Sequence, residues 1–100
     1  MEKRQPHYSL TTLQTRIAEQ GIMVFTATAL FNAAAMGFSE EQVLLVLSSL
    51  TRAMFCKSMT TYADSSIWQD VYHAPTPGGK VAYIKLTLQQ GAVVIQFKEK

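Results

Sequence analysis

This sequence of 100 residues has few cysteines and no long apolar run, two features that would identify some protein classes directly. It contains one cysteine, Cys56, which excludes a disulfide within the chain and would leave a zinc site to other ligands. The longest aliphatic run, residues 43–47, is far shorter than the ~20 residues that span a bilayer. No apolar segment follows the basic start MEKRQPH, so we expect no secretory signal and a reduced, cytoplasmic location without membrane attachment.

Histidine is also scarce, and the familiar cofactor motifs are missing. Neither His7 nor His73 has an acidic residue at metal-ligand spacing, so no metal site is predicted. The segment PTPGGK lacks the strand and helix that flank a phosphate-binding loop, and no cofactor is expected. His73, near the end of a predicted strand, is interpreted as a turn or surface residue.

The composition, 48% hydrophobic and 16% charged, is that of one globular domain, residues 1–100, with a modest core. The charge is unevenly distributed. Residues 1–51 carry three basic and four acidic side chains, whereas residues 52–100 carry six basic and three acidic ones. This asymmetry fits either an ordinary solvated surface or an anion-binding surface on the C-terminal half.

The first half of the chain is predicted to be helical. Residues 9–21 and 26–37 each begin with a hydroxyl residue suited to cap a helix and end with a glycine. A third helix starts at Ser39, which forms a capping box with Gln42. The apolar segment 22–25 is predicted to be a brief strand or an extended connection.

The second half is predicted to form strands. Residues 67–73, 80–88 and 92–98 are rich in β-branched and aromatic side chains, and turn sequences separate them at PTPGG and at Gln90-Gly91. Helices followed by an antiparallel sheet are typical of an α+β fold.

The last hairpin has a register that its own pattern favours. A two-residue loop at Gln90-Gly91 sets three apolar pairs on one face. These pairs are Leu88 with Val93, Leu86 with Ile95, and Ile84 with Phe97. The other face then holds Tyr83 opposite Lys98 and Lys85 opposite Gln96.

The register of the preceding strand stays open. A five-residue loop at 75–79 sets Gln69 opposite Lys85 and Val71 opposite Tyr83, so that Gln69 shares the polar face. A four-residue loop would turn Gln69 toward the helices instead.

The segment KSMTTYADSSIWQDVY, residues 57–72, is either a polar loop leading into a strand or the rim of a working site. Lysines neutralise phosphates and aromatic rings stack on unpaired bases, so single-stranded RNA is the ligand that this chemistry fits. Metal-free RNA cleavage needs a base, a cation and an acid, which lysine and tyrosine can supply. The candidate residues are Lys57, Lys85, Lys98, Tyr83, Tyr62 and Tyr72, with Trp68 nearby.

The segments KSMTTY, IWQDVY, YIKLT and FKEK, together with the opening MEKRQPH, resemble the MqsR family of messenger-RNA-cleaving toxins over roughly half the chain. This resemblance implies a RelE-like fold, a small twisted antiparallel sheet with helices packed on one face. It also implies a metal- and ribosome-independent endoribonuclease that cuts single-stranded messenger RNA at GC-centred sites such as GCU. The implied partner is a cognate MqsA-like antitoxin with a zinc-bearing N-terminal domain and a DNA-binding C-terminal domain; no direct DNA binding is expected without it.

The resemblance also assigns residues. The family's catalytic set falls on Lys57, Gln69, Tyr83 and Lys98, and an outward Gln69 selects the five-residue loop. Cys56 stands where the family has an aromatic residue, which would shift the cleavage preference. Contacts with RNA are expected from Lys85, Met59, Tyr62 and Cys56.

Roles within the set follow from ordinary chemistry. Tyr83 would exchange a proton with the reacting oxygens, and Lys98 would lower its pKa. Lys57 and Lys98 would stabilise the phosphorane charge, and Gln69 would orient the phosphate or the 2′-OH. The alternatives are a non-catalytic RNA-binding or protein-interaction module on the same scaffold, and a structural domain with a solvated polar face.

Overall fold

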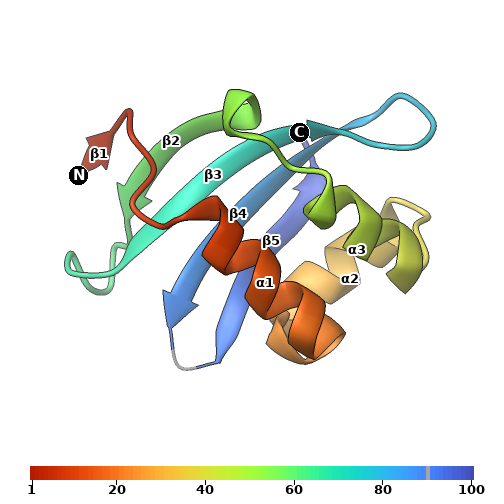
Figure 1. Ribbon diagram of the computed structural model, residues 1–100, viewed down its shortest axis with the longest axis horizontal. Helices are drawn as coiled ribbons and strands as arrows, with labels where there is room; N and C mark the ends of the chain where they lie inside the picture. The colour runs from red at the N-terminus through yellow and green to blue at the C-terminus, as the bar shows by residue number, and fades with distance from the viewer. Residues whose placement is uncertain (90) are drawn as a thin grey trace.

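The computed structural model describes residues 1–89 and 91–100, and its helices gather on one side of a curved sheet (Figure 1). Within these residues the helical segments follow one another in the first half of the chain. They are α1 (Leu10–Gln20), the 3-10 helix η1 (Gly21–Val24), α2 (Ala27–Ala35), α3 (Glu40–Ser48) and the 3-10 helix η2 (Arg52–Met54).

The predicted helix caps are confirmed. The Ser9 side chain accepts a hydrogen bond from the backbone N–H of Thr12, and α1 ends at Gly21, whose φ of 58° suits glycine. At the start of α3 both halves of the Ser39–Gln42 capping box are present. These signals depend on residues close in sequence, which is why the pattern predicts them well.

The apolar segment 22–25 differs from the prediction. Most of it lies in η1, and Phe25 forms an isolated parallel bridge with Val94. The backbone N–H of the next residue, Thr26, donates to the carbonyl of Val94 at 3.0 Å. This contact links the start of α2 to the sheet.

The sheet is antiparallel, and its strands follow the chain in the order β1-β2-β3-β4-β5. The strands are β1 (Glu2–Lys3), β2 (Phe55–Thr60), β3 (Trp68–Pro75), β4 (Val81–Gln89) and β5 (Ala92–Glu99). The α+β class is therefore confirmed. The sequence did not predict β1 and β2, because β1 has two residues and β2 is polar with few β-branched side chains.

The last hairpin largely keeps the predicted register. Tyr83 lies opposite Lys98, and Lys85 lies opposite Gln96. The predicted pair of Leu86 with Ile95 is wrong, because Leu86 lies opposite Val94. An irregularity on either side of Leu86 shifts the pairing of β4 with β5, and both Val93 and Val94 are buried there. Gln90, in the predicted turn, lies outside the described residues.

The β3–β4 connection has five residues, Thr76 to Lys80, but it begins one position later than predicted. The N–H of Thr76 donates to the carbonyl of Lys80 at 3.1 Å and closes the turn. Tyr83 therefore faces His73 rather than Val71, and Lys85 faces Val71 rather than Gln69. A shift of two positions keeps each side chain on its face, so Gln69 still shares the face of Tyr83.

The helix-facing side of the sheet forms the core. Tyr72, Ile84, Leu86 and Phe97 are completely buried there, and helix residues such as Leu13 complete the cluster. In the part of the chain that the structure describes, no helix covers the opposite side of the sheet (Figure 1), which we call the outer face. Among the described residues, no helix is long and apolar enough to cross a membrane.

A buried carboxylate holds the N-terminal segment against the sheet. Asp70 accepts hydrogen bonds from the backbone N–H groups of His7 and Tyr8 and from the Ser58 hydroxyl, the last at 2.6 Å. The His7 ring stacks on Trp68 with their centroids 5.3 Å apart. This anchoring fixes the segment that carries β1 to the edge of β2.

Candidate active site

The outer face presents its side chains in three neighbouring rows, set by the strand register. The first row is Met59 and Gln69; the middle row is Lys57, Val71, Lys85 and Gln96; the third row is His73, Tyr83 and Lys98. Side chains directly opposite on an antiparallel pair have Cβ atoms roughly 4.5–5.5 Å apart. The register therefore brings Lys57, which is distant in sequence, into the row next to that of Tyr83 and Lys98.

Two cations lie close to the aromatic ring of Tyr83. The Lys98 ammonium lies 5.4 Å from the centre of the Tyr83 ring, and the Lys85 ammonium lies 5.9 Å from it. The ring of His73 lies across the strand pair, with its centroid 5.7 Å from that of Tyr83. Such a cluster offers positive charge and proton-exchanging groups to one bound anion.

The middle row is partly desolvated although no helix covers it. Val71 is completely buried between Lys57 and Lys85, since the aliphatic parts of lysine side chains can cover an apolar neighbour. Burial lowers the pKa of Lys85, and the charges of Lys98 and Lys57 lower it further. A cluster of like charges of this kind favours binding of an anion.

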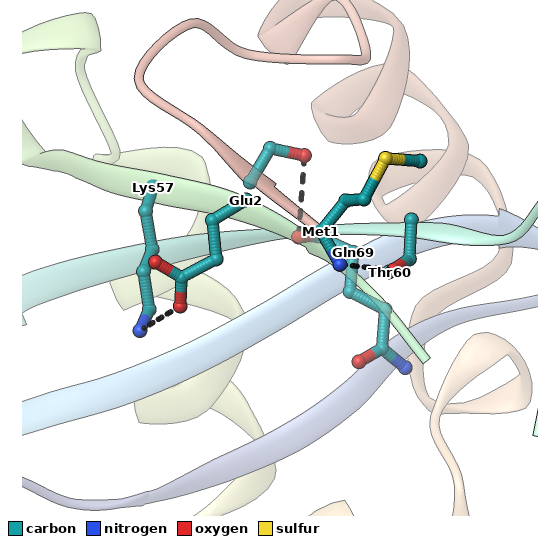
Figure 2. A network of polar contacts seen from close by, with 6 residues as sticks. Met1, Glu2, Lys57, Thr60 and Gln69 are labelled. Carbon is teal, nitrogen blue, oxygen red and sulfur yellow. Dashed lines mark hydrogen bonds and ion pairs between the residues drawn. The ribbon is translucent and has the colours of Figure 1, made fainter. Parts of the chain in front are cut away.

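Lys57 forms an ion pair with Glu2 of β1. The Lys57 ammonium donates to the Glu2 carboxylate at 2.9 Å, and the N-terminal ammonium of Met1 donates to the Thr60 hydroxyl at 2.9 Å (Figure 2). The hydrogen bond and the charge of Glu2 raise the pKa of Lys57, and those of Lys57 lower the pKa of Glu2. Lys57 thus stays charged, but its ammonium already has an anionic partner.

Tyr83 is held in its neutral form. Burial raises the pKa of Tyr83, and the charge of Lys57 lowers it by less. The prediction that Lys98 lowers the pKa of Tyr83 is wrong, because the lowering charge is that of Lys57 and partial burial outweighs it. At neutral pH the phenol is a proton donor.

Gln69 lies two rows away from Tyr83. It is four positions from His73 along β3, or about 13 Å at ~3.3 Å per residue. Its cross-strand partner is Met59. Gln69 is therefore placed at one end of the outer face, and Tyr83 and Lys98 at the other.

A hollow of about 240 Å³ opens beside the Gln69 end of the site. Tyr62 at its rim is fully exposed. The hollow combines a phenol and two thioethers with one carboxylate and the hydroxyls of two threonines. Its lining residues are Met1, Glu2, Met59, Thr60, Thr61 and Tyr62.

Cys56 lies at an irregularity of β2, where the register shifts between Phe55 and Lys57. Its half-buried thiol is close enough to affect the pKa of both Lys57 and Tyr83. The structure thus groups Cys56 with these two side chains.

Two aromatic residues expected near the site lie elsewhere. Tyr72 is completely buried in the core, and Trp68 is on the helix-facing side, where Lys3 and His7 cover it. Both occupy even-numbered positions of β3, whereas Gln69, Val71 and His73 point to the outer face.

Sequence reasoning missed two site residues. His73, predicted to be a turn or surface residue, is half-buried beside Tyr83 on the outer face. The correct loop boundary would have revealed it, since that boundary sets the partner of Tyr83. Glu2 carried no local signal, because 55 positions separate it from Lys57. Across residues 1–89 and 91–100, no three His, Cys, Asp or Glu side chains gather as metal ligands.

Comparison with known proteins agrees with the resemblance. A family model described as "Motility quorum-sensing regulator, toxin of MqsA" matches residues 5–99. The mRNA interferase toxin MqsR of Escherichia coli (strain K12) is 39% identical over 100 residues, which cover the whole of both chains. The chain therefore belongs to the MqsR toxin family.

Proposed function

We propose that this protein is an endoribonuclease toxin that cleaves single-stranded messenger RNA without a metal ion. The observation that carries the proposal is the cross-strand pair of Tyr83 and Lys98, beside Lys57 and Lys85, on a sheet face without helices. Membership of the MqsR family supports it, as does the name of the E. coli relative, an mRNA interferase.

The proposed reaction is an internal transfer at phosphorus. The ribose 2′-oxygen loses its proton and attacks the adjacent phosphorus, and the bond from phosphorus to the 5′-oxygen breaks. Lys57 and Lys98 stabilise the charge that develops on the phosphoryl oxygens, and neutral Tyr83 protonates the leaving 5′-oxygen. The products are a 2′,3′-cyclic phosphate and a 5′-hydroxyl.

The remaining site residues would bind the nucleotides around the cleaved bond. Lys85 would neutralise a neighbouring phosphate, and Gln69 would hydrogen-bond a flanking nucleotide. Met59 and Tyr62 would hold a base in the hollow beside Glu2, since exposed aromatic rings stack on unpaired bases.

Cleavage at GC-centred sites such as GCU is the proposed specificity, with a shift caused by Cys56. This residue lies close to Lys57 and Tyr83, where a base or sugar of the bound strand would pass. A thiol offers less stacking surface than an aromatic ring, so Cys56→Tyr is expected to change which sites are cut first.

The proposed partner is an MqsA-like antitoxin that holds the toxin inactive. The family description names the toxin as that of MqsA, which supports a protein of this kind. DNA binding would belong to the antitoxin, and the toxin itself would act in the cytoplasm, where messenger RNA is translated.

A cleavage assay tests the proposal. The purified chain is incubated with a single-stranded RNA that contains every trinucleotide, in the presence of EDTA, and cut sites are mapped by primer extension. Tyr83→Phe and Lys57→Ala are run in parallel with Tyr72→Phe, a matched control that removes a buried hydroxyl instead. We expect discrete cuts from the unmodified chain and the control, and none from the two site variants. RNA that stays intact with folded, antitoxin-free protein would contradict the proposal and favour a non-catalytic module.

A further inference from the structure

Three of the four residues assigned by the resemblance are poor bases for the 2′-hydroxyl. A general base works best when its pKa is near the working pH. Lys57 and Tyr83 both have raised pKa values, so each is protonated at neutral pH. The amide of Gln69 does not accept a proton in this range. The site so described has cations and an acid, but it needs a base.

His73 has the position that such a base requires. It lies directly opposite Tyr83 on the outer face, with ring centroids 5.7 Å apart, and Lys98 follows in the same row. Its side chain is half-buried, so one side remains open to a ligand. Within the described residues, neither ring nitrogen of His73 forms a hydrogen bond. The chain's other histidine, His7, is occupied by Lys3 and Trp68 on the far side of the sheet.

We propose that His73 is the general base of the cleavage reaction. Its neutral imidazole takes the proton of the 2′-OH, the 2′-oxygen forms a bond to phosphorus, and Tyr83 gives its proton to the departing 5′-oxygen. Solvent then takes the proton from the imidazolium and restores the phenol. The inference rests on the proposed function, because it completes the acid–base pair of the same site.

The surroundings of His73 suit this role. Burial lowers its pKa, and the positive charges of Lys100 and Lys57 lower it further. The imidazole is therefore neutral, and able to accept a proton, at physiological pH. On the helix-facing side, Arg52 of η2 lies over the ring of Phe55. The titratable groups that share the outer face with His73 are Glu2 of β1, Lys57 of β2, Tyr83 and Lys85 of β4, and Lys98 of β5, and Cys56 lies beside Lys57 at the irregularity of β2.

Two other side chains of the outer face, Glu2 and Lys85, are alternative candidates for the base. Glu2 has a lowered pKa because its carboxylate is bonded to Lys57, which makes it a weaker base. Lys85 has a lowered pKa, but an ordinary lysine starts from about 10.4. The three candidates predict different pH profiles. Loss of activity on acidification would begin below about 4.3 for Glu2, below about 6.5 for His73 and below about 10.4 for Lys85.

The test is the pH dependence of single-turnover cleavage for the full chain and for His73→Gln, with His7→Gln as the matched control. We expect the unmodified chain and His7→Gln to lose activity below about pH 6.5. His73→Gln should cleave at least ~100-fold more slowly and lack this titration. Its affinity for an RNA with a 2′-deoxy nucleotide at the cleaved bond should change less than about twofold, because RNA binding does not need the base. Should the glutamine variant fail to fold, His73→Asn takes its place.

Addition of imidazole gives a second readout. His73→Ala should regain part of its cleavage rate when imidazole is supplied, whereas Tyr83→Phe should not. Cleavage by His73→Gln at the unmodified rate and with the same pH profile would overturn the inference. If His73→Gln cleaves normally but Tyr83→Phe is inactive, the inference about His73 falls and the proposed nuclease function still stands. If the unmodified chain binds the RNA but cleaves nothing at any pH, both the function and the inference fall.

Discussion

The carboxylate of Glu2 lies 2.9 Å from the ammonium of Lys57, on the sheet face that also carries Tyr83. Strand β1 creates this contact, because its pairing with β2 sets Glu2 opposite Met59 and on the same face as Lys57. A phosphate group that binds at this face therefore meets a lysine that already has a carboxylate partner. Glu2 and the phosphate compete for the same cation.

Removal of this competitor should tighten RNA binding. We expect Glu2→Gln to bind a 2′-deoxy-blocked RNA several-fold more tightly, and its log–log salt slope should be steeper by about 0.7, as for one further phosphate contact to a single strand. Fluorescence anisotropy at several salt concentrations measures both quantities. Glu99→Gln is the matched control, since Glu99 pairs with Lys80 at 3.8 Å and lies opposite Ala82. Equal or weaker binding by Glu2→Gln would show that the carboxylate does not compete with RNA.

Tyr72 and Tyr83 should respond in opposite ways to the loss of a hydroxyl. Among the described residues, the buried Tyr72 hydroxyl has no hydrogen-bond partner. Tyr72→Phe should therefore leave the melting temperature unchanged or slightly raised, and leave RNA cleavage intact. Tyr83→Phe should keep the melting temperature but lower the cleavage rate at least ~100-fold. Thermal unfolding and cleavage assays on both variants check this; loss of cleavage in Tyr72→Phe would count against the assignment of Tyr83.

The buried Tyr72 hydroxyl should also make the stability of the folded protein depend on pH in the alkaline range. Burial raises the pKa of Tyr72 to about 12, with a smaller effect from Asp70. Between pH 10 and 12 the unfolded chain releases this proton and the folded chain keeps it, so stability falls as the pH rises. The stability of Tyr72→Phe should fall less over this range, which denaturant titrations at several pH values measure. Identical pH dependence in the two proteins would mean that Tyr72 does not contribute.

Asp70 should be important for stability rather than for catalysis. Its buried carboxylate accepts from two backbone N–H groups and the Ser58 hydroxyl. Asp70→Ala leaves these donors without a partner and should lower the free energy of unfolding by about 3 kcal/mol. Asp64→Ala is a suitable control, because the exposed side chain of Asp64 accepts hydrogen bonds from Ser66 within its own loop. Denaturant unfolding distinguishes them, and an equal effect of the two substitutions would contradict this role of Asp70.

Gln69 should influence substrate binding more than the chemical step. It lies about 13 Å from the row of Tyr83, beside Met59. Gln69→Ala is therefore expected to raise KM several-fold with little change in kcat, whereas Lys98→Ala should lower kcat. Steady-state kinetics on a short RNA separates the two effects. A large fall in kcat for Gln69→Ala would mean that its amide reaches the reacting phosphate.

Local sequence signals predicted the helices and the last hairpin well. The Ser39–Gln42 box and the pairing of Tyr83 with Lys98 depend on residues close in the chain, where spacing and turn chemistry are informative. Prediction was weaker for β2, whose polar residues form a strand because β1 and β3 pair with it. Strand formation depends more on such neighbours than on the residues themselves.

The sequence by itself determined the α+β class, the helix ends, the alternation that sets Tyr83 and Lys98 on one face, and the motifs that mark the family. Only the tertiary structure decided the partners across the longer connections. A shift of one loop boundary placed His73 instead of Val71 beside Tyr83, and a two-residue strand placed Glu2 on Lys57. The physical reason is that side-chain alternation specifies which face a residue occupies, whereas loop closure and long-range strand pairing specify what it meets there.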